Sequence, residues 1–143
     1  MNKRVAIAND HAGLALKQAL VSEIESLGFT VENLGTDSDA SVDYPDYGQK
    51  IAKHIADGHA VFGIAICGSG VGISIACNRV AGVRAALCQT GLTAELARKH
   101  NNANVLALGA RLIGIEEAKE CVRRFLTTTF EGGRHESRVK KLG

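Results

Sequence analysis

The sequence predicts an α/β protein, a three-layer α/β/α sandwich with a Rossmann-like five-stranded parallel sheet, and three observations lead to it. Apolar runs of strand length alternate with segments of helical periodicity along all 143 residues. The run at residues 60–67 is almost continuously apolar, which is typical of a parallel strand covered on both faces. Polar or glycine-rich turns follow the strands, where open parallel sheets bind ligands. At roughly 150 residues per domain, we expect a single domain over residues 1–143.

The first half of the chain supplies three strands and two helices. Short apolar stretches predict the strands, and apolar residues three or four apart predict the helices. Residues 35–45 are polar and predict a surface loop. In chain order, we expect a strand at Val5–Ala8, a helix from Leu16 to Leu27 ended by Gly28, a strand at Thr30–Leu34, a helix with Tyr47, Ile51 and Ile55 on one face ended by Gly58, and a strand at Ala60–Cys67.

The second half repeats this alternation. A glycine-rich turn at residues 68–72 opens a short helix that runs to about Asn78. The elements expected after it are a strand at Val83–Cys88, a helix from Thr90 to about His100 with Leu92 and Leu96 on one face, a strand at Asn104–Leu108, and a last helix marked by Ile115, Ala118, Val122, Phe125 and Leu126.

Composition excludes several functional classes. No apolar run reaches the roughly 18 residues that a membrane span needs, and the first residues lack the pattern of a secretory signal, so we expect a cytoplasmic protein without membrane contact. A net charge of +2 and an aromatic content of 4% argue against nucleic-acid binding, because base stacking needs rings. The basic C-terminal segment 131–143 fits a solvated tail, a phosphate-binding arm or a nucleic-acid contact.

The turn Gly68-Ser69-Gly70-Val71-Gly72 is a candidate anion site. Glycines between a strand and a helix let the backbone approach a ligand, and the helix N-terminus points free N–H groups at an anion or an oxyanion. The turn lacks the Gly-Lys-Ser/Thr ending of a P-loop and the spacing of a dinucleotide fingerprint. A tight turn made only for close packing is the structural alternative.

Cys67 ends the strand before this turn, so it is a candidate base or nucleophile, because a helix N-terminus favours the thiolate. The chain has four cysteines and no Cys-x-x-Cys, and we expect Cys77, Cys88 and Cys121 to be buried free thiols. A core position is the alternative for Cys67 as well.

Two further polar groups follow predicted elements. Asp10 and His11 come after the first strand, where they could bind a polar ligand or, for Asp10, cap a helix. They are adjacent, and the sequence shows no partner at ligand spacing, so no metal site is predicted. His100 ends a helix, where it could complement the helix dipole or act as a general acid or base.

A set of motifs spread over the whole chain resembles the ribose-5-phosphate isomerase B family, which includes allose-6-phosphate and galactose-6-phosphate isomerases. The motifs, in order, are Asn9-Asp10-His11-Ala12-Gly13, Asp43-Tyr44-Pro45, Cys67-Gly68-Ser69-Gly70-Val71-Gly72-Ile73, His100-Asn101-Asn102-Ala103-Asn104-Val105-Leu106 and Glu131-Gly132-Gly133-Arg134-His135.

The resemblance implies an aldose–ketose isomerase that interconverts ribose 5-phosphate and ribulose 5-phosphate in the non-oxidative pentose phosphate pathway, without metal or cofactor. It implies that Cys67 is the base that moves a proton between C2 and C1 through a cis-enediolate, and that His100 opens the furanose ring. Ser69 and the amides from Gly68 to Gly72 would stabilise the enediolate. The resemblance implies that Asp10 is both a catalytic residue and a substrate contact. The other residues that would contact the substrate are His11, Tyr44, Asn101, Arg111, Arg134 and Arg138.

The resemblance also implies a site between two subunits, hence a homodimer or homotetramer. Some family branches use a carboxylate base eight residues after the cysteine position, but Ile75 stands there in this chain. Arg134 and Arg138 are four residues apart and can share one helical face, which favours a phosphate-binding arm. A hexose 6-phosphate such as allose 6-phosphate is the alternative substrate, and a non-catalytic sugar-phosphate-binding domain is the alternative class.

Overall fold

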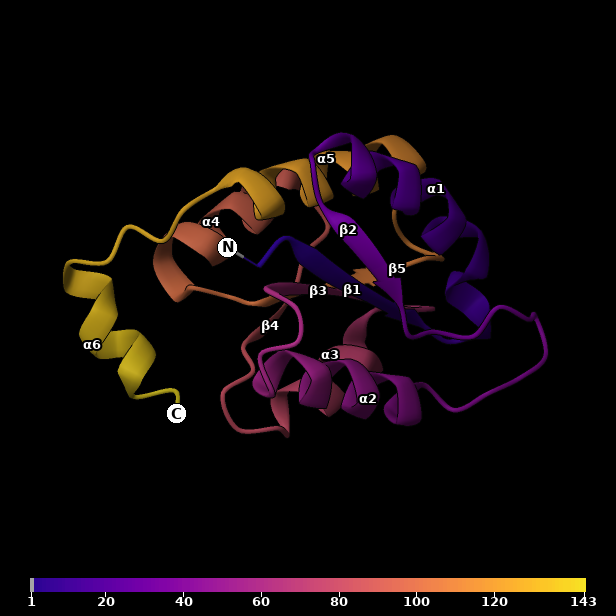
Figure 1. The fold of residues 1–143 in the computed structure, drawn as a ribbon, viewed down its shortest axis with the longest axis horizontal. Coiled ribbons are helices and arrows are strands. Elements are labelled where there is room, and N and C mark those ends of the chain that lie inside the picture. Colours follow the sequence, from indigo (N-terminus) through magenta and orange to yellow (C-terminus); the bar gives the residue numbers. More distant parts are fainter. Residues whose placement is uncertain (1) are drawn as a thin grey trace.

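A computed structural model describes residues 2–143; Met1, the first residue of the predicted domain, lies outside them. Its centre is one parallel sheet in the order β2-β1-β3-β5-β4, drawn in Figure 1. The strands are β1 (Arg4–Asn9), β2 (Thr30–Asn33), β3 (Phe62–Cys67), β4 (Ala85–Leu87) and β5 (Val105–Gly109). The predicted number of strands and their parallel arrangement are confirmed.

Helices cover both faces of the sheet and complete the predicted three layers. α1, α4 and α5 lie on one face and α2 and α3 on the other, as Figure 1 shows. A short 3-10 helix, η1, joins β1 to α1. The bounds are η1 (His11–Gly13), α1 (Leu14–Ser26), α2 (Tyr44–Ala56), α3 (Val71–Asn78), α4 (Gly91–Asn101), α5 (Ile115–Thr127) and α6 (Arg134–Lys140).

The two faces of the sheet differ in side-chain size because alternate strand residues point to opposite faces. Branched side chains of the central strands pack under α1, α4 and α5: Val5, Ile7, Ile64, Ile66, Leu106 and Leu108. Small side chains pack under α2 and α3: Ala6, Ala8, Ala65, Cys67 and Ala107. Cys67 therefore belongs to the face on which the helices meet a row of alanines.

Two boundaries and one helix face differ from the sequence prediction. α2 begins at Tyr44, inside the predicted loop, because a proline such as Pro45 fits the first turn of a helix. β4 is shorter than predicted, since the N–H of Val83 bonds to the carbonyl oxygen of Val80 in a turn. The predicted stripe of α4 is exposed, and Leu92 is 57% accessible, because the alanines of α4 make its buried face.

The connections of β1 and β3 leave a crevice at the carboxyl ends of these neighbouring strands. The chain leaves β1 through α1 to reach β2 on one side, and returns through α2 to β3 on the other side of β1. Such a switch point is where open α/β sheets bind ligands. Asp10 follows β1 and Cys67 ends β3, so the two side chains start at this point.

Asn78 closes part of the outer edge of β4. Its Oδ1 accepts a hydrogen bond from the N–H of Ala85 at 2.7 Å, and its Nδ2 donates to the carbonyl oxygen of Ala85 at 3.0 Å. Arg84 bonds inward to β5, so the groups of Ala85 face outward. The side chain thereby takes the place of the next strand.

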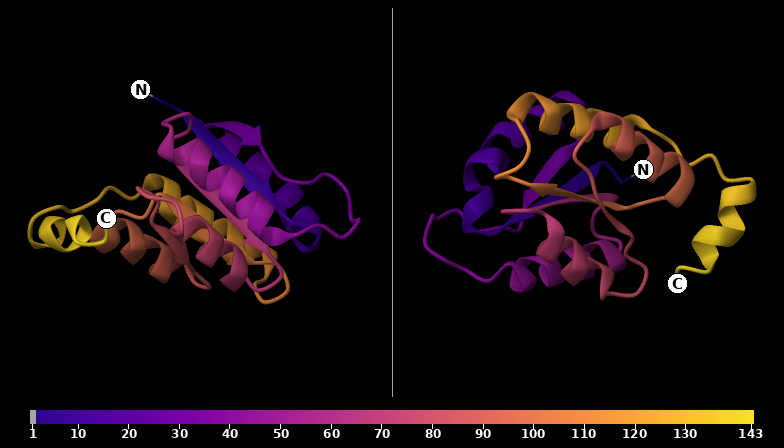
Figure 2. Two further views of the ribbon diagram at one scale, coloured as in Figure 1. Left: turned by 90° about the horizontal axis from the view of Figure 1, so that it is seen from below. Right: turned by 180° about the vertical axis from the view of Figure 1, so that it is seen from behind.

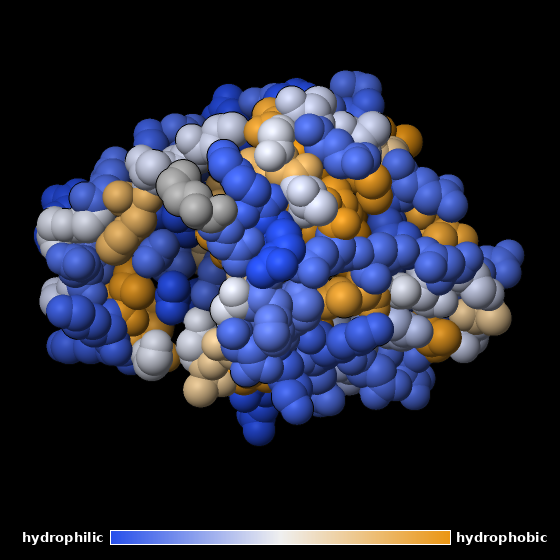
Figure 3. Space-filling model, in the orientation of Figure 1, coloured by the Kyte–Doolittle hydropathy of each residue, from blue (hydrophilic) through white to orange (hydrophobic). Residues whose placement is uncertain are grey.

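The basic C-terminal segment includes α6, which the views of Figure 2 show projecting from the rest of the molecule. The N–H of Glu131 donates to the carbonyl oxygen of Lys99, and this bond joins the segment to the end of α4. Figure 3 shows apolar side chains among the polar surface over α6. Among the described residues, none of the helices is both long and apolar enough to span a bilayer.

Candidate active site

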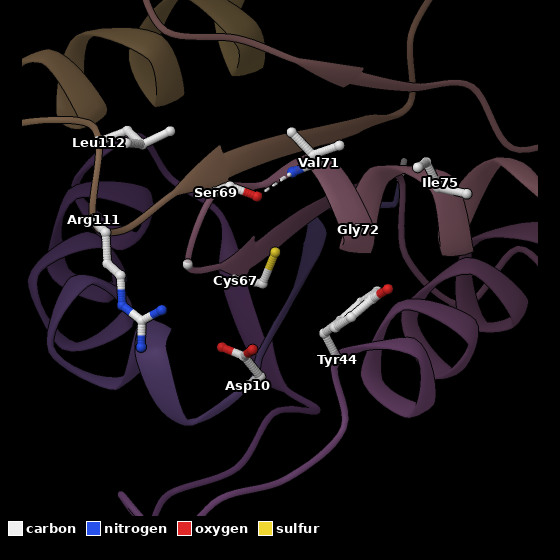
Figure 4. Close-up of a pocket in the computed structure, with 10 residues that line it drawn as sticks. Asp10, Tyr44, Cys67, Ser69, Val71, Gly72, Ile75, Arg111 and Leu112 are labelled. Atoms are coloured by element: carbon white, nitrogen blue, oxygen red, sulfur yellow. Dashed lines mark hydrogen bonds between the residues drawn. The ribbon is translucent and has the colours of Figure 1, made fainter.

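A cavity of about 550 Å³ opens at the switch point. Figure 4 shows residues from the segment after β1, from α2, β3 and α3, and from the segment after β5 around one space. The residues that line it are Asp10, Tyr44, Cys67, Gly68, Ser69, Val71, Gly72, Ile75, Arg111 and Leu112. Most of the predicted site residues therefore meet in one place.

Cys67 lies at the base of this cavity, where its side chain is only 4% exposed. Its Sγ accepts a hydrogen bond from the N–H of Gly70 at 3.2 Å. Gly70 is the N-cap of α3 and has a φ of 77°, in the left-handed region that glycine adopts most readily. The sulfur therefore faces an amide at the N-terminus of α3.

The glycine-rich turn is closely packed, as its structural alternative predicts. A Cβ on Gly109 would lie 2.5 Å from the backbone oxygen of Ser69, and a Cβ on Gly72 would overlap the ring of Tyr44. Ser69 Oγ accepts from the N–H of Val71 at 3.2 Å, which leaves its hydroxyl hydrogen free to donate toward the cavity.

Asp10 caps a helix, which is one of its two predicted readings, and its place in the cavity is compatible with the other, contact with a polar ligand. Its Oδ1 accepts from the N–H of Ala12 at 3.0 Å and so caps η1, and the carboxylate also lines the cavity. His11 is not among the lining residues. Its Nδ1 accepts from the N–H of Val42 at 3.1 Å, so a neutral His11 carries its proton on Nε2 and presents a donor there.

Lys17, which the sequence prediction missed, fixes the loop that brings Val42 to His11. It is 3% exposed, and its Nζ donates to the carbonyl oxygen of Thr36 at 2.6 Å, to Asp37 Oδ1 at 2.7 Å and to Asn33 Oδ1 at 3.2 Å. This bond to Lys17 is the main reason that the pKa of Asp37 is lowered. In sequence, Lys17 looks like the polar face of α1, so nothing signals its burial.

Two other predicted residues approach the cavity from different sides. Arg111 follows β5, and its N–H donates to the carbonyl oxygen of Gly68 at 3.0 Å, which places the guanidinium beside the glycine turn. Tyr44 starts α2 and lies against Gly72. The predicted grouping of residues that follow β1, β3 and β5 is observed.

The remaining predicted residues lie elsewhere in this chain. His100, Asn101 and Arg138 line a second cavity of about 260 Å³, between α4 and α6, together with His135, Val139 and Leu142. Arg134 is exposed and lines neither of these two cavities. A single chain therefore holds the thiol and this histidine in separate cavities.

The other three cysteines are confirmed as free and buried. Burial raises the pKa of Cys77 and of Cys88 to about 12 and that of Cys121 to about 11. Cys77 Sγ donates to the carbonyl oxygen of Gly48 at 3.4 Å. These thiols stay protonated at neutral pH, and only Cys67 lines the cavity at the switch point.

A buried thiol that faces helix amides at a sheet switch point, with a carboxylate, a hydroxyl and an arginine around the same cavity, defines an α/β enzyme for a small polar substrate. The family model described as Ribose/Galactose Isomerase matches residues 5–142. Ribose-5-phosphate isomerase B of Escherichia coli is 44% identical over 140 residues, which cover 98% of this chain and 94% of that protein.

Solved structures agree with the family match. A ribose 5-phosphate isomerase of Thermotoga maritima superposes with a TM-score of 0.95 at 50% identity, over 99% of this chain and 98% of that one. The type B ribose 5-phosphate isomerase of Trypanosoma cruzi gives a TM-score of 0.96 at 41% identity, over 99% and 95% of the two chains. The chain belongs to the ribose/galactose isomerase family, as its motifs predicted.

Proposed function

We propose that this enzyme interconverts D-ribose 5-phosphate and D-ribulose 5-phosphate. The observation that carries the proposal is the Cys67 sulfur in the cavity at the switch point, with the Gly70 N–H at 3.2 Å. Removing a proton beside a carbonyl needs a base and donors for the oxyanion, and the thiol and the turn amides supply both. The names of the similar proteins support the same substrate.

The first step opens the furanose ring. His100 gives a proton to the ring oxygen O4 as the C1–O4 bond breaks, and a water molecule takes the proton of the O1 hydroxyl as the C1=O1 bond of the aldehyde forms. An imidazole suits this exchange because it gives and takes protons near neutral pH. His100 reaches solvent at the end of α4, where a sugar can approach it.

The second step moves hydrogen between carbons. The Cys67 thiolate removes the proton from C2, the C1=C2 bond forms and the negative charge goes to O1 of a cis-enediolate. The proton then returns to C1, C2=O2 forms, and O1 keeps the hydrogen that O2 gives up. Ser69 and the turn amides face the oxygens that carry this charge, and Asp10 holds a sugar hydroxyl beside them.

Arginines bind the phosphate in this proposal. Arg134 and Arg138 lie one helical turn apart on α6, and a guanidinium suits a phosphate through its bidentate geometry. Arg111 and the Nε2–H donor of His11 bind the substrate from the side of the first cavity, and Asn101 binds it beside His100.

The proposed active unit is a homodimer or homotetramer with the site between subunits. The two sets of residues lie in separate cavities of one chain, so a second copy must bring α4 and α6 to the cavity of Cys67. Apolar side chains exposed at that cavity support such a contact: Ile75 is 59% and Leu112 63% accessible.

A turnover panel tests the substrate assignment. Ribose 5-phosphate, allose 6-phosphate and phosphate-free ribose are compared at equal concentration, by the appearance of the ketose. We expect ribose 5-phosphate to be turned over faster than either of the others. A higher kcat/KM for allose 6-phosphate would move the assignment to a hexose phosphate, and binding without turnover of any sugar would indicate a binding domain.

A further inference from the structure

His100 is half of a stacked pair of imidazoles. Its ring centroid lies 4.4 Å from that of His135, and the two ring planes are 14° from parallel. His135 belongs to the first turn of α6 and is 8% exposed, whereas His100 reaches solvent. The buried ring therefore forms a floor on which the exposed ring lies.

A carboxylate stands at the edge of both rings. Glu131 Oε1 is 3.5 Å from Nε2 of His135 and 3.9 Å from Nε2 of His100. Glu131 is four residues before His135, and its own N–H bonds to the carbonyl oxygen of Lys99, which fixes this backbone beside the end of α4. The carboxylate can thus attract a proton on either imidazole.

The cluster of His100, Glu131 and His135 could either bind a metal ion or support one imidazole with the other, and the stacking of the rings decides between these two uses. Its ligand atoms all lie within 4.8 Å of one another, a spacing that a metal ion could share. An imidazole binds a metal in the plane of its ring, however, and two stacked, nearly parallel planes do not meet at one ion. The arrangement fits support of one ring by another.

Charges around the pair separate the roles of the two histidines. Burial, then the adjoining His100 and Arg134, lower the pKa of His135, while Glu131 acts in the opposite direction. Arg138 on α6 also acts on His135, and Lys99 on α4 acts on Glu131. Two positive rings in contact would repel each other, and the lowered pKa of His135 favours a neutral ring beside His100.

We propose that His135 and Glu131 are positioning residues for His100: the neutral ring of His135 holds the His100 imidazole by stacking, and the Glu131 carboxylate stabilises its protonated form. This inference rests on the proposed function, in which His100 opens the sugar ring. The inference gives a role in ring opening to two residues that take no part in the proposed transfer of hydrogen between C1 and C2.

The substrate itself separates ring opening from the later proton transfer. Ribose 5-phosphate is mainly a furanose, whereas ribulose 5-phosphate is open-chain because its O5 carries the phosphate. Exchange of the C1 hydrogen of ribulose 5-phosphate with solvent deuterium requires the base but no ring chemistry. Variants that disturb only His100 should therefore slow ribose 5-phosphate turnover and leave the wash-in of deuterium close to that of the parent protein.

Three variants test the proposal. Glu131→Gln should lower kcat for ribose 5-phosphate about tenfold, because it removes a charge that supports a general acid–base group. In the profile of kcat against pH for Glu131→Gln, the limb that reports ionisation of His100 should move to lower pH. The direction is the same whether the protonated or the neutral form of His100 is the active one. His135→Ala should lower kcat similarly, and His135→Phe, which keeps a flat ring under His100, should restore turnover to within about threefold of the parent.

The chain holds a matched control. His54 and His59 also form an imidazole pair, with centroids 5.0 Å apart, and Glu32 Oε1 lies 3.0 Å from His54 Nε2. Glu32→Gln and His59→Phe should leave turnover and the pH profile unchanged. Circular dichroism and the KM of the exchange reaction report whether α6 still folds in His135→Ala, since loss of α6 would also remove the proposed phosphate arginines.

The outcomes are distinct. Unchanged turnover and an unchanged pH profile in Glu131→Gln and His135→Ala overturn the positioning role while the proposed function stands. Equal loss of turnover and exchange also overturns it, because the two residues would then act beyond ring opening. A parent protein that catalyses neither reaction refutes the proposed function instead.

Discussion

The N–H of Gly70 points at the sulfur of Cys67 across 3.2 Å, and the left-handed backbone of Gly70, with a φ of 77°, makes this possible. A Cβ at residue 70 would lie 2.5 Å from Leu87 Cδ1 and 2.8 Å from the carbonyl carbon of Leu108. The conformation and the tight packing therefore both require glycine where the amide meets the thiol.

Gly70→Ala should destabilise the protein by about 2–5 kcal/mol, the sum of left-handed strain and overpacking, and should displace the amide from the sulfur. Urea unfolding and turnover measure the two effects. Gly28→Ala is the matched control: its φ of 92° gives a similar strain, but a Cβ there meets no described atom within 4 Å, so only about 1–2 kcal/mol should be lost. Equal losses in the two variants would contradict the packing argument.

Cys67→Ala should lower turnover by about 10³-fold or more, because it removes the proposed base. Titration calorimetry with ribose 5-phosphate should still detect binding, since the arginines and the glycine turn remain. Cys88→Ala, a buried change on the other face of the sheet, serves as control and should keep turnover. Full activity in Cys67→Ala would disprove the base assignment.

Alkylation should select Cys67. With pKa values of about 12, 12 and 11, Cys77, Cys88 and Cys121 expose very little thiolate at pH 8, at most roughly one part in 10³. Iodoacetamide should therefore add one group, located by peptide mass spectrometry at Cys67, in step with lost activity. Labelling of a buried cysteine first would contradict this prediction.

The same raised pKa values predict an alkaline limit of stability. The thiols are protonated in the fold, while in the unfolded chain they ionise from about pH 9, the ordinary value of 9.0. The stability they contribute is thus present below pH 9 and is lost as the pH rises toward 12. Thermal melting between pH 8 and 11 should show a falling Tm, and a constant Tm would speak against the burial effect.

Lys17→Met should raise KM more than it lowers kcat, because the loop that places Val42 against His11 loses its buried anchor. Three acceptors lose their donor, so we also expect a stability loss of about 1–3 kcal/mol. Lys50→Met, an exposed lysine on α2, is the matched control and should change neither quantity by much. Parent-like KM in Lys17→Met would show that the loop needs no such anchor.

Arg134→Ala should weaken substrate binding about 10- to 100-fold, the range for a hydrogen bond to a charged group, with a smaller effect on kcat. Lys141→Ala, just beyond the end of α6, is the control of equal charge change. Steady-state kinetics over a range of ribose 5-phosphate concentrations measures both constants. If ribose and ribose 5-phosphate bound the parent protein equally well, the phosphate role of Arg134 would be wrong.

The sheet and the first cavity could be predicted from sequence because their signals are local. Apolar runs define the strands, and Asp10, Cys67 and Arg111 follow directly after three of them. The environments of Lys17 and His135 could not be predicted in this way. Lys17 has the sequence of a surface position, and His135 meets His100 only after α6 folds back toward α4. Such contacts depend on tertiary geometry, although the four-residue spacing from Glu131 to His135 is a signal that could have suggested their pairing.

At the β4 edge of the sheet, the side chain of Asn78 makes the hydrogen bonds to Ala85 that a neighbouring strand would make. Asn78 occupies the donor and the acceptor of Ala85 that another molecule's backbone could otherwise use. The β4 edge of one molecule is therefore prevented at Ala85 from pairing with the sheet of another molecule, even in concentrated solution. Hydrolysis of the Asn78 side-chain amide should therefore cause aggregation of folded molecules before it lowers turnover at the cavity of Cys67.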